Sequence, residues 1–171
     1  GSTISYSNLA RDLEKDPNTI KRWLQLLEDL YIIFRITPYH HNIARSLLQE
    51  SKYYFYDIGQ VRDPGCKLEN LVACALLKQL HDIEDLEGYR TSMHFLRTKD
   101  GKEIDFMALV DNSPKVMIEV KQSDATFSKA FNYFKPFFPD TPQLQLVKNT
   151  PRNLTFQNGC RLEKMAPWLA R

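Results

Sequence analysis

The chain has 171 residues, and its 23 Lys and Arg against 21 Asp and Glu leave a net charge of +2 with the histidines neutral. A content of 43% hydrophobic and 26% charged residues is typical of a globular protein and excludes disorder, collagen and coiled coil for the whole chain. No run approaches the ~18 consecutive apolar residues of a membrane span and no secretory leader is present, so we expect a cytoplasmic protein with no membrane partner.

The first residues and the cysteines bear on the origin of the chain. Gly1-Ser2 stands in place of an initiator Met, a pattern typical of a removed tag, so residues 1–2 predict a tag scar on a piece of a longer protein. Cys66, Cys74 and Cys160 lack CxxC spacing, and we expect reduced thiols rather than a disulfide framework or a zinc site.

Two helices are predicted near the start of the chain. Leu9 and Leu13 recur at helical spacing, and Asp16-Pro17 supplies an N-cap followed by proline at the first helical position. The second helix, over Thr19–Leu30, carries an apolar stripe that we expect to face a core. The stripe consists of Ile20, Trp23, Leu24, Leu27 and Leu30.

Two apolar strands are predicted to follow, near Ile32–Ile36 and at Tyr53–Asp57. Together with the two helices they predict a partial winged helix-turn-helix over residues 3–63, in which the Thr19–Leu30 helix is the candidate DNA-reading element. Eight basic and eight acidic side chains cancel within residues 1–63. Because phosphate neutralisation supplies most non-specific DNA affinity, this balance favours a docking or linking role over duplex reading.

Residues 64–171 predict a second unit that mixes helices and strands. A helical stripe over Cys66–Leu80 ends in an acidic, turn-like stretch at Asp82–Gly88. Strands are then predicted at Met93–Thr98, Lys102–Val110, Lys115–Lys121 and Gln143–Lys148. A helix over Ala125–Phe138, with core aromatic residues and an early end or kink at Pro136, makes the crossover to the last strand. The predicted fold class is α/β (α+β), a mixed sheet flanked by helices.

Candidate chemistry lies on two neighbouring strands. Strict alternation puts Ile104, Phe106 and Ala108 on one face, with Glu103 and Asp105 on the other. The same rule puts Glu119 and Lys121 together on the next strand.

Whether Asp105 meets Glu119 depends on the register of the hairpin, because directly paired residues face the same side. The numbers 105 and 119 add to 224, and in a regular antiparallel hairpin every directly paired couple of residues must have the same sum. Closure by Val110 with Pro114, or by Leu109 with Lys115, satisfies this condition. Pairing of Val110 with Lys115 would separate the carboxylates unless a bulge intervened.

Two carboxylates within ~4–6 Å repel, so that either one is protonated or a divalent cation neutralises both. Mg²⁺ is commonly bound by one or two carboxylates plus a phosphate. We therefore predict a Mg²⁺ or Mn²⁺ site at Asp105 and Glu119, beside which Lys121 orients water or stabilises charge on phosphorus. Glu69 is a candidate fourth member, or a partly exposed glutamate near the positive end of its helix dipole.

The sequence resembles the PD-(D/E)xK nuclease superfamily in one motif. The motif consists of Asp105, a gap of 13 residues and Glu119-Val120-Lys121, and it lies in an α-β-β-β-α-β order of predicted elements. The resemblance implies a restriction-endonuclease-like fold for residues 64–171. It makes Asp105 and Glu119 the metal carboxylates, Lys121 the catalytic lysine and Glu69 a supporting catalytic acid. Ile104 stands where the motif has its proline.

Longer runs resemble the C-terminal region of a prokaryotic AAA-type ATPase family, in which a P-loop module precedes a winged helix and a nuclease-like domain of uncharacterised function. These runs are residues 4–10, 19–24, 54–59, 68–72 and 101–106. The chain has no GxxxxGK[ST] sequence, so we expect no ATP hydrolysis by this fragment. ATP would act only through the upstream ATPase module, which the resemblance implies as a partner.

Two functions remain open from the sequence. One is a metal-dependent phosphodiesterase, a hydrolase that acts on DNA, and it is favoured by the carboxylate–carboxylate–lysine set. The other is a non-catalytic module that couples the ATPase to DNA or to a protein, and it is favoured by sparse basic charge. Residues 64–171 hold 15 basic and 13 acidic side chains. Four lysines of this unit have two possible interpretations, a basic cluster that follows a nucleic-acid backbone or side chains on a solvated hairpin edge. They are Lys99, Lys102, Lys115 and Lys121.

Overall fold

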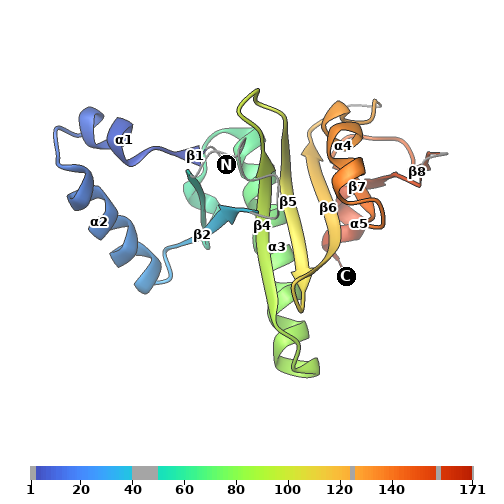
Figure 1. Ribbon diagram of the computed structural model, residues 1–171, viewed down its shortest axis with the longest axis horizontal. Coiled ribbons are helices and arrows are strands. Elements are labelled where there is room, and N and C mark those ends of the chain that lie inside the picture. The colour runs from blue at the N-terminus through green and yellow to red at the C-terminus, as the bar shows by residue number, and fades with distance from the viewer. Residues whose placement is uncertain (1–2, 40–49, 124–125, 157–158, 171) are drawn as a thin grey trace.

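The computed structural model describes residues 3–39, 50–123, 126–156 and 159–170 (Figure 1). Its helices are α1 (Tyr6–Asp12), α2 (Pro17–Asp29), α3 (Pro64–Glu87), α4 (Lys129–Phe134) and α5 (Met165–Leu169), with short 3-10 helices η1 (Ile58–Gln60) and η2 (Lys135–Phe137). Its strands are β1 (Thr3–Ile4), β2 (Ile33–Pro38), β3 (Ser51–Phe55), β4 (Thr91–Arg97), β5 (Glu103–Val110), β6 (Ser113–Lys121), β7 (Gln143–Val147), β8 (Leu154–Thr155) and β9 (Arg161–Lys164). The expected tag scar, Gly1-Ser2, lies outside the described residues.

Within the described residues the strands form one mixed sheet in the order β1-β3-β2-β4-β5-β6-β7-β9-β8. The β4-β5-β6 meander is antiparallel, and β6 pairs in parallel with β7 after the crossover through α4. This confirms the predicted mixed sheet. The sheet also includes the N-terminal strands, because β2 pairs in parallel with β4 through Thr37↔His94 and Pro38↔Phe95. The two regions of the chain are therefore joined by main-chain hydrogen bonds.

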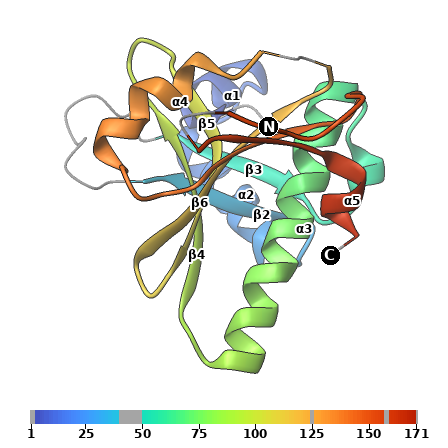
Figure 2. The same ribbon diagram turned by 90° about the vertical axis from the view of Figure 1, so that its right-hand side faces the viewer.

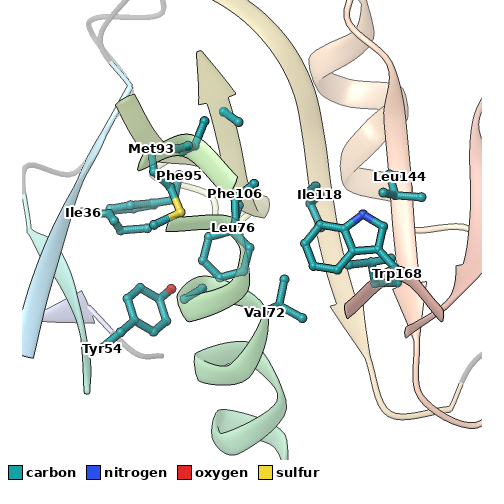
Figure 3. Close-up of a cluster of buried hydrophobic side chains, with 14 of the residues drawn as sticks. Ile36, Tyr54, Val72, Leu76, Met93, Phe95, Phe106, Ile118, Leu144 and Trp168 are labelled. Carbon is teal, nitrogen blue, oxygen red and sulfur yellow. The ribbon is translucent and has the colours of Figure 1, made fainter. Parts of the chain in front are cut away.

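Helices cover both faces of the sheet (Figure 2). On one face, α3 and α5 pack on a core that includes Tyr54, Phe106, Ile118 and Trp168 (Figure 3). On the other face, α4 contributes Phe131 and other aromatic side chains to a second core. Burial of these two sets of apolar side chains is the main favourable contribution to folding of this part of the chain.

The N-terminal helices pack on a third, smaller core around Ile20 and Leu24. As predicted, α2 begins after Asp16, whose side chain accepts a hydrogen bond of 2.7 Å from the backbone N–H of Asn18. Two members of the predicted apolar stripe are nevertheless exposed, Trp23 by 46% and Leu30 by 58%. For these two the core assignment is wrong, because the small α1 and β2–β3 surfaces cover only one side of α2.

The long helix α3 extends further than the sequence pattern indicated. The acidic stretch at Asp82–Gly88, expected to form a turn, is helical as far as Glu87. Its acidic side chains are largely solvated, and Lys78 forms an i,i+4 ion pair of 2.6 Å with Asp82. The helix ends where Gly88 adopts the left-handed conformation, with φ of 75°. No described helix is long and apolar enough to cross a lipid bilayer.

The predicted crossover helix is shorter than expected. Among the described residues of the predicted range, only Lys129–Phe134 is α-helical, and the 3-10 turn η2 follows because Pro136 cannot continue the α-helix. Ala125 lies outside the described residues. The core role of the aromatic residues is confirmed, since Phe131 and Phe134 are fully buried. The last elements, β8, β9 and α5, have no counterpart in the sequence-based prediction.

Candidate functional site

The β5–β6 hairpin has the register that the proposed carboxylate pair requires. Phe106 pairs with Ile118 and Ala108 with Val116, so each pair of residue numbers adds to 224. Continued by one residue, this register sets Asp105 opposite Glu119.

The pair of residues that closes the hairpin differs from both predicted closing pairs. Val110 pairs with Ser113 around a two-residue turn, in which Asp111 and Asn112 have positive φ of 48° and 61°. Such a turn matches the twist of the flanking strands. A bulge at Lys115 then shifts the pairing by one residue. The predicted closing pairs are wrong because a tight turn plus a bulge replaces a longer, regular loop.

Asp105 lies at a second bulge, where β5 meets β4. His94 pairs with Met107 and Leu96 with Ile104, which leaves Asp105 and Phe106 together opposite Phe95. Alternation is broken there, so Ile104 packs in the α4-side core while Phe106 and Ala108 pack in the α3-side core. The predicted grouping of Ile104 with Phe106 and Ala108 is therefore wrong.

Lys52 on β3 lies at the centre of the acidic side chains. Its Nζ is 3.0 Å from Glu69 Oε1, 2.5 Å from Glu103 Oε1 and 3.6 Å from Asp105 Oδ1. The side chain is 1% exposed, and its ammonium lies 5.4 Å from the centroid of the Phe95 ring. Burial by itself lowers the pKa of Lys52, but the carboxylates outweigh burial and raise the pKa well above its ordinary value. The ammonium is therefore a permanent positive charge inside the protein.

Glu69 faces this lysine from α3. Its Oε1 accepts hydrogen bonds from Lys52 and from the hydroxyl of Tyr54, the latter at 2.7 Å. Burial opposes ionisation of Glu69, but the charge of Lys52 and the other favourable interactions, among them the Tyr54 hydrogen bond, together outweigh burial, so the pKa of Glu69 lies below its ordinary value. The next residue, Asn70, accepts from the backbone N–H of Phe55 and donates to its carbonyl oxygen. These neighbouring side chains therefore attach β3 to α3.

The carboxyl groups of Asp105 and Glu119 are close enough for the charge of Glu119 to affect the pKa of Asp105. Asp105 Oδ2 accepts a hydrogen bond of 2.9 Å from the backbone N–H of Val120. Burial, and then the negative charge of Glu119, raise the pKa of Asp105 to about 7. Glu119 is 6% exposed, and burial raises its pKa against the opposing effect of Lys121, whose Nζ is 2.8 Å from Oε1. The second carboxylate oxygen of Glu119, Oε2, is buried and has no hydrogen-bond partner in the part of the chain that the structure describes.

Among the described residues, one oxygen of each predicted metal ligand has no hydrogen bond to the backbone. Asp105 Oδ1 lies 3.6 Å from the ammonium of Lys52, and Glu119 Oε2 has no partner. Both are hard oxygen donors of the kind that Mg²⁺ and Mn²⁺ bind. Over the described parts of the chain, no group of three or more His, Cys, Asp or Glu side chains is arranged to hold a metal.

The structure separates the four lysines that the sequence suggested as one cluster. Lys115 lies near the turn at the start of β6 and Lys121 at the other end, about 20 Å apart along an extended strand. Lys102 packs over the ring of Tyr133, with its ammonium 4.7 Å from the ring centroid. These side chains therefore do not form a single patch around the carboxylates.

Sequence reasoning did not identify Lys52 or Tyr54 as members of the site. The predicted strand at Tyr53–Asp57 begins after Lys52, whereas the observed β3 spans Ser51–Phe55. Had the strand been extended by two residues, its period of two would have put Lys52 on the same side as Tyr54. A lysine on the apolar side of a strand needs a buried anionic partner, and this was the available signal.

The fold and this site define an α+β protein whose mixed sheet carries a cluster of carboxylates around the buried Lys52. Comparison with known families then gives the assignment. The chain belongs to the family of a domain of unknown function, DUF4143, which matches residues 64–166. This domain is typically found at the C-terminus of AAA-type ATPases, in agreement with the ATPase resemblance seen in the sequence.

A second domain of unknown function, DUF8612, matches residues 1–62. No curated protein and no solved structure matches the chain. The winged-helix and PD-(D/E)xK assignments stay predictions.

Proposed function

We propose that this chain is a nuclease-like region of an ATPase-linked protein that hydrolyses DNA phosphodiester bonds with Mg²⁺ or Mn²⁺ bound at Asp105 and Glu119. The observation that carries the proposal is the Oε2 atom of Glu119, a buried carboxylate oxygen with no hydrogen-bond partner among the described residues. An acceptor in this state costs free energy, and such costs are concentrated at functional sites. The raised pKa of neighbouring Asp105 supports the same interpretation.

Each residue has a separate role in the proposed site. The Val120 N–H orients the Asp105 carboxylate, so that Oδ1 is presented as a ligand. Lys121 is 39% exposed while bonded to Glu119, so its ammonium lies between the carboxylate and solvent, where it can orient water or stabilise negative charge on a phosphate. A divalent metal, when bound, polarises the phosphate and lowers the pKa of a coordinated water.

The N-terminal region fits a winged helix. Helices α1 and α2 precede the antiparallel β2–β3 pair, in the order that this unit requires. The exposed Trp23 and Leu30 on α2 favour docking against a protein over reading of duplex DNA. We assign DNA affinity mainly to the upstream ATPase module, because residues 3–63 carry no excess basic charge.

A second candidate function is a non-catalytic interaction module. The observation that favours it is Lys52, whose ammonium neutralises part of the charge of the carboxylate cluster. In that case the cluster attaches β3 to the rest of the sheet, and the region couples the ATPase module to DNA or to a protein.

Cleavage assays distinguish the two functions. Labelled single- and double-stranded DNA would be incubated with the protein and Mn²⁺ or Mg²⁺, with a chelator as the first control. The proposal expects cleavage by the wild type and by Asp100→Asn, which changes an exposed aspartate in the β4–β5 turn. It expects none by Asp105→Ala. Equal cleavage by wild type and Asp105→Ala would assign the activity to another source, and no cleavage by either would favour the interaction module.

A further inference from the structure

The acidic cluster is shared between the two regions that match different families. Lys52 comes from β3, within residues 1–62, whereas Glu69, Glu103 and Asp105 come from α3 and β5, within residues 64–166. The N-terminal region therefore supplies a positive charge to a site whose carboxylates all belong to the other region.

The three contacts of the Lys52 ammonium differ in length. Those to Glu103 and Glu69, at 2.5 and 3.0 Å, have hydrogen-bond lengths, whereas Asp105 Oδ1 is 3.6 Å away and beyond that range. The weakest contact is therefore the one to the predicted metal ligand. The other Asp105 oxygen is already bonded to the Val120 N–H, so a metal and Lys52 would both be attracted to Oδ1.

We propose that Lys52 is a resident cation that competes with a divalent metal for Asp105, so that the N-terminal region sets the metal affinity of the site. This inference rests on the proposed function, since it assumes metal binding at Asp105 and Glu119. The side chain of Lys52 is 1% exposed, so its charge is poorly screened by water. A dication near Asp105 is repelled by this charge while Lys52 stays bonded to Glu69 and Glu103.

Two roles of Lys52, competition with the metal and positioning of the carboxylates, predict opposite effects of its removal on metal affinity. If Lys52 only positions Asp105, its removal disorders the ligand and weakens metal binding. If Lys52 competes with the metal, its removal strengthens binding. The sign of the change in metal affinity therefore decides between the two roles.

The direct test is a calorimetric titration of Mn²⁺ into the wild type, Lys52→Met and Lys21→Met. Lys52→Met keeps the length of the side chain and removes its charge. Lys21→Met is the matched control, because it makes the same change at an exposed lysine on α2, outside the site. We expect Mn²⁺ to bind Lys52→Met at least about tenfold more tightly than the wild type. We expect Lys21→Met to bind Mn²⁺ as the wild type does.

Unchanged or weaker Mn²⁺ binding by folded Lys52→Met, with binding by the wild type, would overturn the inference and leave the proposed function intact. Binding by Lys52→Met alone would support the inference, because the resident charge then excludes the metal from the wild type. Absence of binding by both proteins would overturn the inference together with the metal-dependent function.

A second measurement uses the wild type and so does not depend on folding of the variant. The ¹⁵N resonance of the Lys52 ammonium would be followed by NMR during titration with Mg²⁺. Competition predicts a shift of this resonance that saturates together with the calorimetric binding curve. Saturation of the protein with Mg²⁺ without any shift at Lys52 would contradict the inference.

Discussion

The N-terminal helices and the carboxylate cluster are opposite in their chemistry. Helix α2 leaves apolar side chains such as Trp23 and Leu30 in contact with solvent, whereas the cluster withdraws Lys52 and Glu119 from it. Exposed apolar area is typical of a surface that a partner covers, and buried charge is typical of a functional site. On the proposed function, the candidate chemistry and the candidate docking surface therefore lie in different regions of the chain, although β3 contributes the central cation of the cluster.

The strongest test of this contrast removes the central charge. Lys52→Met leaves buried carboxylates without their shared cation, and we expect a loss of about 3–5 kcal/mol in the free energy of unfolding. Urea unfolding followed by circular dichroism measures the loss. Lys21→Met, an exposed lysine on α2, is the matched control and should change stability by less than about 0.5 kcal/mol. Similar stability of the two variants would show that the cluster does not depend on Lys52.

The next largest effect concerns the two ends of β6. We expect Lys121→Met to lower kcat for DNA cleavage by about 10²–10³-fold, because a charge that stabilises the transition state is lost. Lys115→Met, at the other end of the strand, should leave kcat unchanged. Steady-state kinetics with Mn²⁺ provides the comparison, and an equal loss in both variants would argue against a special role for Lys121.

The attachment of β3 to α3 is expected to be weaker than the ionic cluster. Asn70→Ala removes the hydrogen bonds to the backbone N–H and to the carbonyl oxygen of Phe55, and we expect a loss of about 1–3 kcal/mol in unfolding free energy. Asp85→Ala, an exposed change on the same helix, serves as the control. A negligible effect of Asn70→Ala would mean that β3 is held mainly by its strand neighbours.

The pH dependence of metal binding follows from Asp105. Because burial and Glu119 raise the pKa of Asp105 to about 7, its carboxyl group is mostly protonated below that pH and ionised above it. Metals bind the ionised form, so we expect apparent Mn²⁺ affinity to fall about tenfold for each pH unit below the pKa. Titrations across neutral pH measure this slope. A flat profile would indicate that Asp105 does not bind the metal.

The smallest expected effect concerns α2. Ile20 is buried against α1 and β2, and Ile20→Val should cost about 0.5–1.5 kcal/mol of unfolding free energy. Leu26 is 54% exposed, and Leu26→Gln should stay within about 0.5 kcal/mol. Thermal unfolding would show both changes, and a large loss for Leu26→Gln would mean that this side chain packs more tightly than its exposure indicates.

Much of the fold was predictable from periodicity and turn signals, and the misses have identifiable causes. The meander and the aromatic core of α4 followed from apolar spacing. The sequence could not predict which side chains of β5 share a face of the sheet. The bulge at Asp105 results from the pairing with β4 and has no local signal in the sequence. A motif in the sequence proposed Asp105, Glu119 and Lys121 as site residues, and their roles stay predictions. Lys52 was missed because its role depends on contacts between residues far apart in the chain.

Binding of Mn²⁺ to the isolated protein is the measurement that tests the central claim most directly. Isothermal titration of the wild type and of Asp100→Asn should give saturable binding at neutral pH. Glu119→Gln should give none, because the unpartnered carboxylate oxygen is replaced by a neutral amide. Equal binding by Glu119→Gln and the wild type, or the absence of binding by the wild type, would contradict a metal site at Asp105 and Glu119.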